Sequence, residues 1–132
     1  MVPDSMACAE SGKVALFIDL LSRVGEARLS ALGSSMMPSI LPGDTLHVQR
    51  CDSTTPRVGD VVMFTRYGRL FAHRVIGSVD GTLVTQGDNL DASDGPVLAS
   101  EFLGRVIKVE PPSLAQRIVR RGRLLKRRLL AA

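Results

Sequence analysis

The stretch Gly33-Ser34-Ser35-Met36-Met37-Pro38-Ser39-Ile40-Leu41-Pro42-Gly43-Asp44 sets a serine among apolar anchors, two prolines and a Gly-Asp turn. Proline restricts the backbone and Gly-Asp favours a turn, so this stretch predicts a tight loop that presents Ser35 rigidly. A serine hydroxyl is a weak nucleophile without a base and a site for the oxyanion. The downstream segments that offer such partners are Phe71–Gly77, which contains a histidine, and Gly87–Gly95, which contains several aspartates.

Three short boxes follow one another along the chain. They are Ser35-Met-x-Pro with Gly43-Asp44, then His73-Arg-Val-Ile, then Gly87-Asp-Asn with Asp94 six positions after Asp88. In order and spacing they resemble the type I signal peptidases of the LexA/signal peptidase superfamily, over roughly Ala27 to Ile107. Bacterial members usually carry Lys where His73 stands. The resemblance is therefore nearest to the Ser-His-Asp branch of the endoplasmic reticulum and archaea.

The resemblance implies a fold and a chemistry. The fold is expected to be mainly β, because many short strands with frequent Gly and Pro turns predict a compact, partly closed β-barrel with an N-terminal amphipathic helix and a C-terminal basic helix. The resemblance implies that this barrel is of the signal peptidase type. The activity is a serine endopeptidase without cofactor or metal, acting on peptides or proteins with small residues near the cleavage site. Ser35 is the expected nucleophile, His73 the general base and Asp94 the residue that orients the histidine.

The oxyanion site departs from the family pattern. The backbone N–H of Ser35 is the family's donor, but the hydroxyl that many relatives place two residues before the nucleophile is replaced by Gly33. Losing one such donor lowers rates by roughly 10²- to 10³-fold in other enzymes, so we expect a slow enzyme unless Ser34 or another group substitutes. The resemblance also implies that the substrate wall includes Met36, Met37 and Pro38.

The remaining polar residues have simpler interpretations. Asp88 and Asn89 are expected to hold their loop through side-chain to backbone hydrogen bonds, and Gly43-Asp44 and Asp60 to make turns. Asp91 is a weaker candidate than Asp94 for the catalytic aspartate. His47 alternates with Leu46 and Val48 and is interpreted as a surface residue.

Apolar periodicity predicts the secondary structure. A helix is expected over Lys13–Val24, capped by Ser11 and ended by Gly25, because apolar residues recur at helical spacing. Alternating or β-rich runs predict strands, with hairpin turns at Arg66–Arg69 and Asp80-Gly81. These strands are Ala27–Ala31, Thr45–Arg50, Val61–Thr65, Leu70–Val79, Thr82–Thr85 and Phe102–Val109.

The chain of 132 residues, 45% hydrophobic, suffices for one small domain with a core of Val, Leu and Ile, since aromatic residues make up only 4%. We divide it into an N-terminal segment and helix (1–26), a catalytic domain (27–110) and a basic tail (111–132). Cys8 and Cys51 lack metal-site spacing, so both are expected to be free thiols.

Charge is concentrated in the tail. Seven of the 17 Lys and Arg residues lie between Arg117 and Arg128, and no acidic residue follows Glu110. Pro111-Pro112 stops the last strand, and Ser113 can cap an amphipathic helix that reaches Leu130. Such a segment binds anionic lipid, nucleic acid or an acidic protein surface, and composition does not choose among them. We expect an anionic membrane surface and do not favour nucleic acid.

No membrane span is predicted, because Asp19 interrupts the best apolar run, Val14–Leu21, and Arg23 follows it closely. The first twelve residues lack the basic and apolar regions of a secretory signal peptide. We therefore expect a cytoplasmic or peripheral membrane location.

Two alternatives to the endopeptidase remain. One is a peptide-binding domain of the same fold without catalysis. The other, weaker, is a LexA-like regulator, since those proteins use a Ser-Lys pair and cut themselves at Ala-Gly or Cys-Gly, neither of which occurs here.

Overall fold

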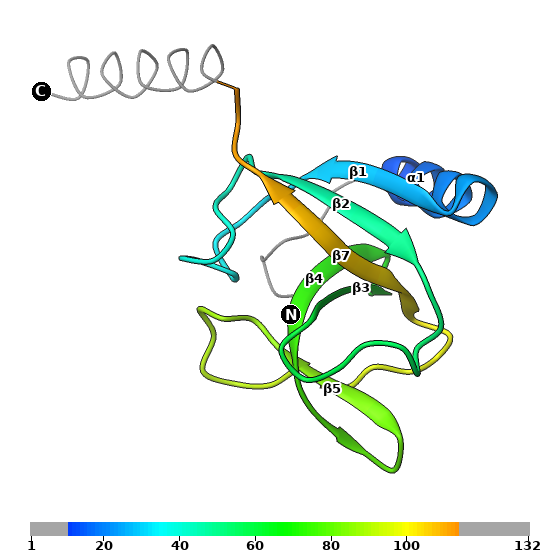
Figure 1. Cartoon of the computed structure of the whole chain (residues 1–132), viewed down its shortest axis with the longest axis vertical. Helices are drawn as coiled ribbons and strands as arrows, with labels where there is room; N and C mark the ends of the chain where they lie inside the picture. Colours follow the sequence, from blue (N-terminus) through cyan, green and yellow to red (C-terminus); the bar gives the residue numbers. More distant parts are fainter. Residues whose placement is uncertain (1–10, 114–132) are drawn as a thin grey trace, which may run out of the picture.

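A computed structural model describes residues 11–113 of the chain. One helix precedes a run of strands (Figure 1). In chain order the elements are α1 (Ser11–Val24), β1 (Glu26–Ser30), β2 (Thr45–Arg50), β3 (Val61–Arg66), β4 (Arg69–Val79), β5 (Thr82–Gln86), β6 (Gly95–Pro96) and β7 (Phe102–Glu110). The predicted basic helix after Ser113, and Cys8, lie outside the described residues.

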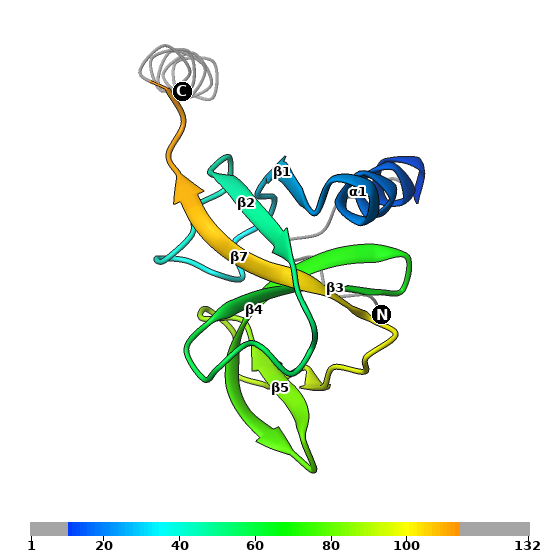
Figure 2. The same ribbon diagram turned by 45° about the vertical axis from the view of Figure 1, so that its right-hand side comes forward.

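The seven strands form one antiparallel sheet in the order β1-β2-β7-β3-β4-β5-β6. A mainly β fold with an N-terminal helix is therefore confirmed. The sheet is strongly twisted (Figure 2), but it is not closed into a barrel. Its two edges, β1 and β6, have five and two residues and do not pair with each other.

Two predicted hairpins are present, and each turn has a glycine at its second central position, where a positive φ carries no steric penalty. Tyr67 and Gly68 have φ of 56° and 70°, and Asp80 and Gly81 have φ of 51° and 78°. Two successive positive angles are typical of the tight turns whose twist matches the flanking strands. Strand β6 was not predicted, because two residues between turns carry no readable period.

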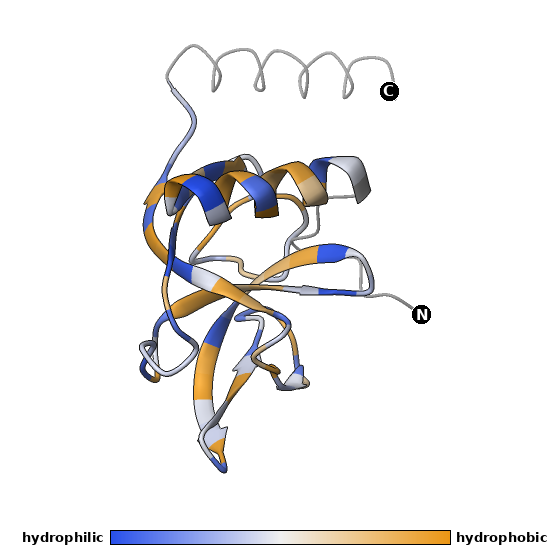
Figure 3. Cartoon of the chain, turned by 90° about the vertical axis from the view of Figure 1, so that its right-hand side faces the viewer, coloured by the Kyte–Doolittle hydropathy of each residue, from blue (hydrophilic) through white to orange (hydrophobic). Residues whose placement is uncertain are grey.

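Helix α1 packs against β1, β2 and β4 (Figure 3). Its residues Val14, Phe17 and Leu21 are buried in the main apolar core. The helix ends at Val24, just before Gly25, as predicted: the φ of Gly25 is 87°, and its N–H donates to the Leu21 carbonyl at 2.9 Å. Among residues 11–113, no helix combines the length and the apolar character needed to cross a membrane.

The core differs from the expected mixture of Val, Leu and Ile. Three of the four phenylalanines, Phe17, Phe64 and Phe71, are buried, as are Met36 and Met63. Composition underestimated them because few aromatic residues suffice when nearly all point inward. Phe64 and Phe71 stack at 5.5 Å between ring centroids and form a separate apolar cluster with Val97, close to the histidine of β4.

Candidate active site

Ser35 lies in the loop between β1 and β2. The loop closes on itself, since the Ile40 N–H donates to the Met36 carbonyl at 3.0 Å. Asp44 ends it, accepting the Leu41 N–H at 2.9 Å through its side chain and the Ala31 N–H at 2.8 Å through its backbone. This confirms Asp44 as a turn residue. Asp60 repeats the arrangement with the Arg57 N–H at 2.9 Å.

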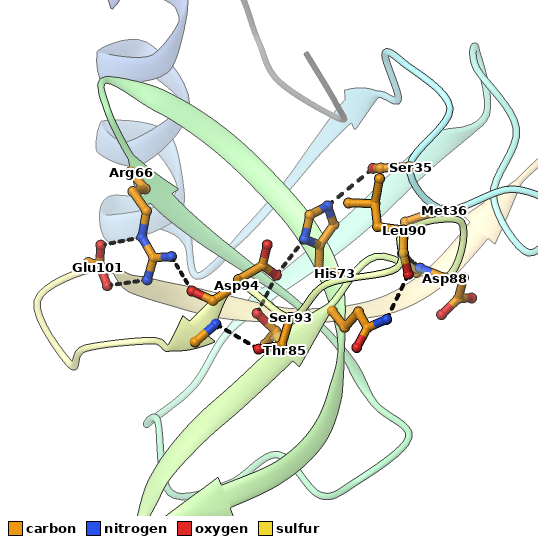
Figure 4. Close-up of polar contacts among 12 residues, drawn as sticks. Ser35, Met36, Arg66, His73, Thr85, Asp88, Leu90, Ser93, Asp94 and Glu101 are labelled. Carbon is orange, nitrogen blue, oxygen red and sulfur yellow. Dashed lines mark hydrogen bonds and ion pairs between the residues drawn. The ribbon is translucent and has the colours of Figure 1, made fainter. Parts of the chain in front are cut away.

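His73 is on β4, at the centre of a hydrogen-bonded chain (Figure 4). Its Nε2 is 3.1 Å from the Ser35 hydroxyl and its Nδ1 is 2.6 Å from a carboxylate oxygen of Asp94. A neutral imidazole that donates Nδ1–H to Asp94 leaves Nε2 as an acceptor for the Ser35 hydroxyl. The three residues predicted from separate boxes are thus brought together in the order that proton transfer requires.

Apolar groups surround the imidazole. His73 is fully buried, and the rings of Phe64 and Phe71 meet it edge-on with centroids 6.0 and 5.8 Å away. Water is therefore excluded from the histidine, and its interaction with the Asp94 carboxylate is less screened than it would be in solvent. Ser35 is only 2% exposed.

Asp94 follows β5 and is held by Thr85, which is also fully buried. The Thr85 hydroxyl donates at 2.7 Å to the same carboxylate oxygen that faces His73. The Asp94 N–H in turn donates at 2.8 Å to the Thr85 carbonyl. Asp91 is exposed and contacts neither His73 nor Ser35 through any hydrogen bond of the described residues.

A second loop, residues 87–90, holds the backbone of the candidate nucleophile through hydrogen bonds. The Asn89 N–H donates to the Ser35 carbonyl at 2.8 Å, and the Asn89 side chain donates to the Ser34 carbonyl at 3.1 Å. Asn89 therefore does hold this region, but across to the other loop rather than within its own.

Asp88 uses partners other than the expected backbone groups. Its carboxylate accepts two hydrogen bonds of 2.8 Å from Arg74 and one of 2.7 Å from the Ser39 hydroxyl. Arg74 lies on β4, one residue after His73. A guanidinium can bind both oxygens of a carboxylate at once, which a single backbone N–H cannot do, so Asp88 pairs with Arg74 rather than with the backbone of its own loop. Hydrogen bonding by Arg74 lowers the pKa of Asp88 below its ordinary value.

The predicted oxyanion donor is the backbone N–H of Ser35. Among the hydrogen bonds of residues 11–113, none uses the Ser35 N–H. Gly33 has a φ of 75°, where a residue with a side chain is strained, and Ser34 is exposed. Of the three predicted wall residues, Met36 is fully buried in the core, whereas Met37 and Pro38 are exposed.

His47 is not the simple surface residue that its strand position suggested. Its side chain is 20% exposed, and its Nε2 is 2.7 Å from a carboxylate oxygen of Glu110. The alternation with Leu46 and Val48 holds, but β7 pairs with β2 and brings Glu110 over the outward side chain.

Cys51 is a free, half-buried thiol. Burial raises its pKa, which disfavours the reactive thiolate. In the part of the chain that the structure describes, no group of three or more His, Cys, Asp or Glu residues is arranged to hold a metal ion.

Sequence reasoning missed the residues that support the site. Thr85, Arg66 and Glu101 belong to no box, and strand patterning alone describes Thr85, Arg66 and Arg74 as ordinary strand residues. The contact between Arg66 and Glu101 spans 35 residues. The one local signal was the position of Arg74 inside the histidine box.

Comparison with models of known protein families finds no match, and comparison with curated proteins finds no similar sequence. The interpretation of this site therefore depends on its geometry and on the boxes themselves. Chemically, the arrangement joins a hydroxyl, a buried imidazole and a carboxylate in one line, which is the arrangement that activates a serine for attack on a carbonyl.

Proposed function

We propose that the chain is a serine endopeptidase of the signal peptidase type, with Ser35 as nucleophile, His73 as general base and Asp94 as its orienting partner. The observation that supports this most directly is the unbroken chain of contacts, 3.1 Å from Ser35 to His73 and 2.6 Å from His73 to Asp94. Residues 38 and 21 positions apart meet here, each with the atom that its role requires.

In this mechanism the Ser35 oxygen attacks the carbonyl carbon of a peptide bond while His73 Nε2 takes the hydroxyl proton. Asp94 stabilises the imidazolium, and the Ser35 N–H stabilises the oxyanion. His73 then gives the proton to the leaving amine, which releases the first product. Water, deprotonated by His73, hydrolyses the ester on Ser35 and restores the free hydroxyl.

The finer features of the family are part of the same proposal. The open sheet corresponds to a signal-peptidase-type core, the substrate carries small residues near its cleavage site, and Met37 and Pro38 contact it. Among the described strands, β1 pairs with β2 alone, and it leads into the Ser35 loop. An extended substrate added along its free edge would reach Ser35 in the direction of the strand. The enzyme acts in the cytoplasm or at a membrane surface.

Incubation with a peptide library, read by mass spectrometry, tests the proposal. The wild-type chain is expected to cut after small residues, and Ser35→Ala to cut nothing. Ser78→Ala is the matched control, because Ser78 is an exposed serine on the same strand as His73. Equal cutting by Ser35→Ala and Ser78→Ala would contradict the assignment.

One observation favours peptide binding without cleavage as a second candidate. Ser35 is almost fully buried, whereas a groove of about 610 Å³ between α1 and the β1-β2-β7 side of the sheet is open and partly apolar. Its lining includes the exposed residues Leu20, Val24 and Ile107. Library peptides that bind without being cut, and whose binding is lost in Leu20→Ser but kept in Ser35→Ala, would favour this candidate.

A further inference from the structure

The Arg66 guanidinium, at the end of β3, joins four parts of the molecule. It forms a two-pronged ion pair with Glu101 at 2.8 and 2.9 Å. Its other N–H groups donate to the Asp94 carbonyl at 2.8 Å and to the Pro96 carbonyl at 3.0 Å. It also lies over the Phe64 ring, 5.2 Å from the centroid.

These contacts complete the fixation of Asp94. The N–H and the carboxylate of Asp94 are held by Thr85, and its carbonyl is held by Arg66 (Figure 4). Residues 91–94 include no strand, so among the described residues the bond to the Thr85 carbonyl is the one backbone–backbone hydrogen bond that holds Asp94. Without Arg66, the carbonyl side of Asp94 would have no side-chain anchor among these hydrogen bonds.

We propose that Arg66, held in place by Glu101, is a positioning residue that aligns the Asp94 carboxylate with His73 Nδ1. This inference rests on the proposed function for its effect on rate, but its geometric content can be measured without any substrate. A loss of alignment leaves His73 free to adopt the tautomer or orientation that cannot take the Ser35 proton.

The geometry requires arginine rather than any cation. A planar guanidinium can satisfy both carboxylate oxygens of Glu101 and two carbonyls at once, whereas a lysine ammonium has three donors and no fork. The pair is largely buried, with 19% and 20% of the two side chains exposed. Hydrogen bonding by Arg66 lowers the pKa of Glu101, so the carboxylate stays ionised near neutral pH.

A second path leads from Arg66 to the histidine. Phe64 contacts both: its ring lies under the guanidinium, and it makes a T-shaped contact with the imidazole. Displacement of the guanidinium therefore disturbs His73 both through Asp94 and through the aromatic wall. Arg66 touches neither Ser35 nor His73 by any hydrogen bond of the described residues, so its effect is indirect.

The test compares Arg66→Lys, which keeps the charge, with the control Arg50→Lys. Arg50 also donates from its guanidinium to a backbone carbonyl, that of Ser22 at 2.7 Å, but on another part of the sheet. Both changes are made in a His47→Gln background, because His47 also approaches a carboxylate and would give a confusing imidazole signal. Proton NMR then reports the hydrogen-bonded Nδ1–H of His73 directly.

The downfield Nδ1–H resonance is expected in the background protein and in Arg50→Lys, and is expected to be lost or broadened in Arg66→Lys although unfolding stays cooperative. In peptide cleavage, kcat of Arg66→Lys should fall by about 10- to 100-fold with KM unchanged. An unchanged resonance in Arg66→Lys overturns the inference. Glu101→Gln, which keeps the shape of the side chain, gives the same test if Arg66→Lys does not fold. Absence of cleavage by the wild-type chain overturns the proposed function instead, and the resonance still decides the positioning role.

Discussion

A β-carbon at position 87 would lie 2.8 Å from the Ser35 carbonyl oxygen, so Gly87 is what allows the 87–90 loop to touch the candidate nucleophile. The contact is with backbone, which cannot move aside as a flexible side chain can. A side-chain carbon of Leu90 would also lie 2.8 Å from that β-carbon. The glycine of the third sequence box therefore has a steric role that its neighbours Asp88 and Asn89 do not share.

Gly87→Ala is expected to separate the two loops and to destabilise the fold by about 1 to 3 kcal/mol, as overpacking of a tight contact usually does. Chemical denaturation measures this change, and cleavage should fall with it. Gly77→Ala is the matched control, since no atom lies within 4 Å of a β-carbon there. Equal stability of the two variants would show that the close approach at Gly87 is unimportant.

Ser35→Ala and His73→Gln should each lower the cleavage rate by roughly 10⁴- to 10⁶-fold, and the double variant should cost little more, because nucleophile and base act as one unit. Glutamine is chosen because His73 is fully buried and alanine would leave a cavity. Steady-state kinetics on one cleaved peptide measure the three rates. If the rate loss of the double variant equals the product of the two single losses, Ser35 and His73 do not act in one shared step.

Asp94→Asn should lower kcat by about 10⁴-fold, since an amide favours the wrong histidine tautomer while keeping the shape of the carboxylate. Asp91→Asn should leave kcat unchanged, because Asp91 is exposed and lies outside the hydrogen-bonded chain. Both substitutions make the same chemical change, the replacement of one carboxylate oxygen by an NH2 group. Equal losses in both would remove Asp94 from the mechanism.

The tail lies outside the described residues, and its membrane contact stays a prediction from sequence. Each basic residue near an anionic leaflet contributes on the order of 1 kcal/mol, and salt weakens the attraction. The full chain should sediment with anionic vesicles at low salt, whereas a chain truncated after Pro112 should stay in solution. Neutral vesicles are the control. Sedimentation of both proteins alike, or without preference for anionic lipid, would contradict the prediction.

The sequence pattern predicted the strands and turns that depend on residues close together in the chain. The strand Thr45–Arg50 agrees with the structure at both ends, and the two predicted hairpin turns lie at Tyr67-Gly68 and Asp80-Gly81, each with a glycine at positive φ. Ser35, His73 and Asp94 were identified because each stands in a recognisable box. The meeting of His73 and Asp94 is a property of the sheet, in which β4 and β5 are neighbours, and Ser35 reaches them from the loop between β1 and β2.

What the sequence did not predict depends on long-range pairing. The half-burial of His47 follows from the arrival of β7, and the partners of Asp88 from the position of Arg74 on β4. The ion pair between Arg66 and Glu101 has no local signature at all. Neither residue belongs to a pattern that would set it apart from any surface charge, and only the folded sheet brings the two together beside Asp94.

The same two ion pairs predict how stability changes with acid. Arg74 lowers the pKa of Asp88 and Arg66 lowers the pKa of Glu101, from ordinary values of 3.8 and 4.5. The unfolded chain therefore binds protons at these carboxylates more readily than the folded chain does. The free energy of unfolding from these groups is fully present above about pH 5 and decreases as pH falls through the lowered folded values.

Urea denaturation at a series of pH values from about 6 to about 3 measures this dependence. Glu101→Gln should be less stable than the wild type at neutral pH, because the amide pairs more weakly with Arg66, and should lose less stability on acidification, since one of the two carboxylates no longer titrates. Asp91→Asn is the control: Asp91 is exposed and pairs with no arginine in the described residues, so its removal should leave the slope unchanged. The assignment requires the slopes to differ in this direction. If Glu101→Gln and the wild type lose stability in parallel between pH 5 and pH 3, the Arg66 pair does not contribute to the acid dependence, which then comes from other carboxylates with lowered pKa values, Asp88 and Glu110 among them.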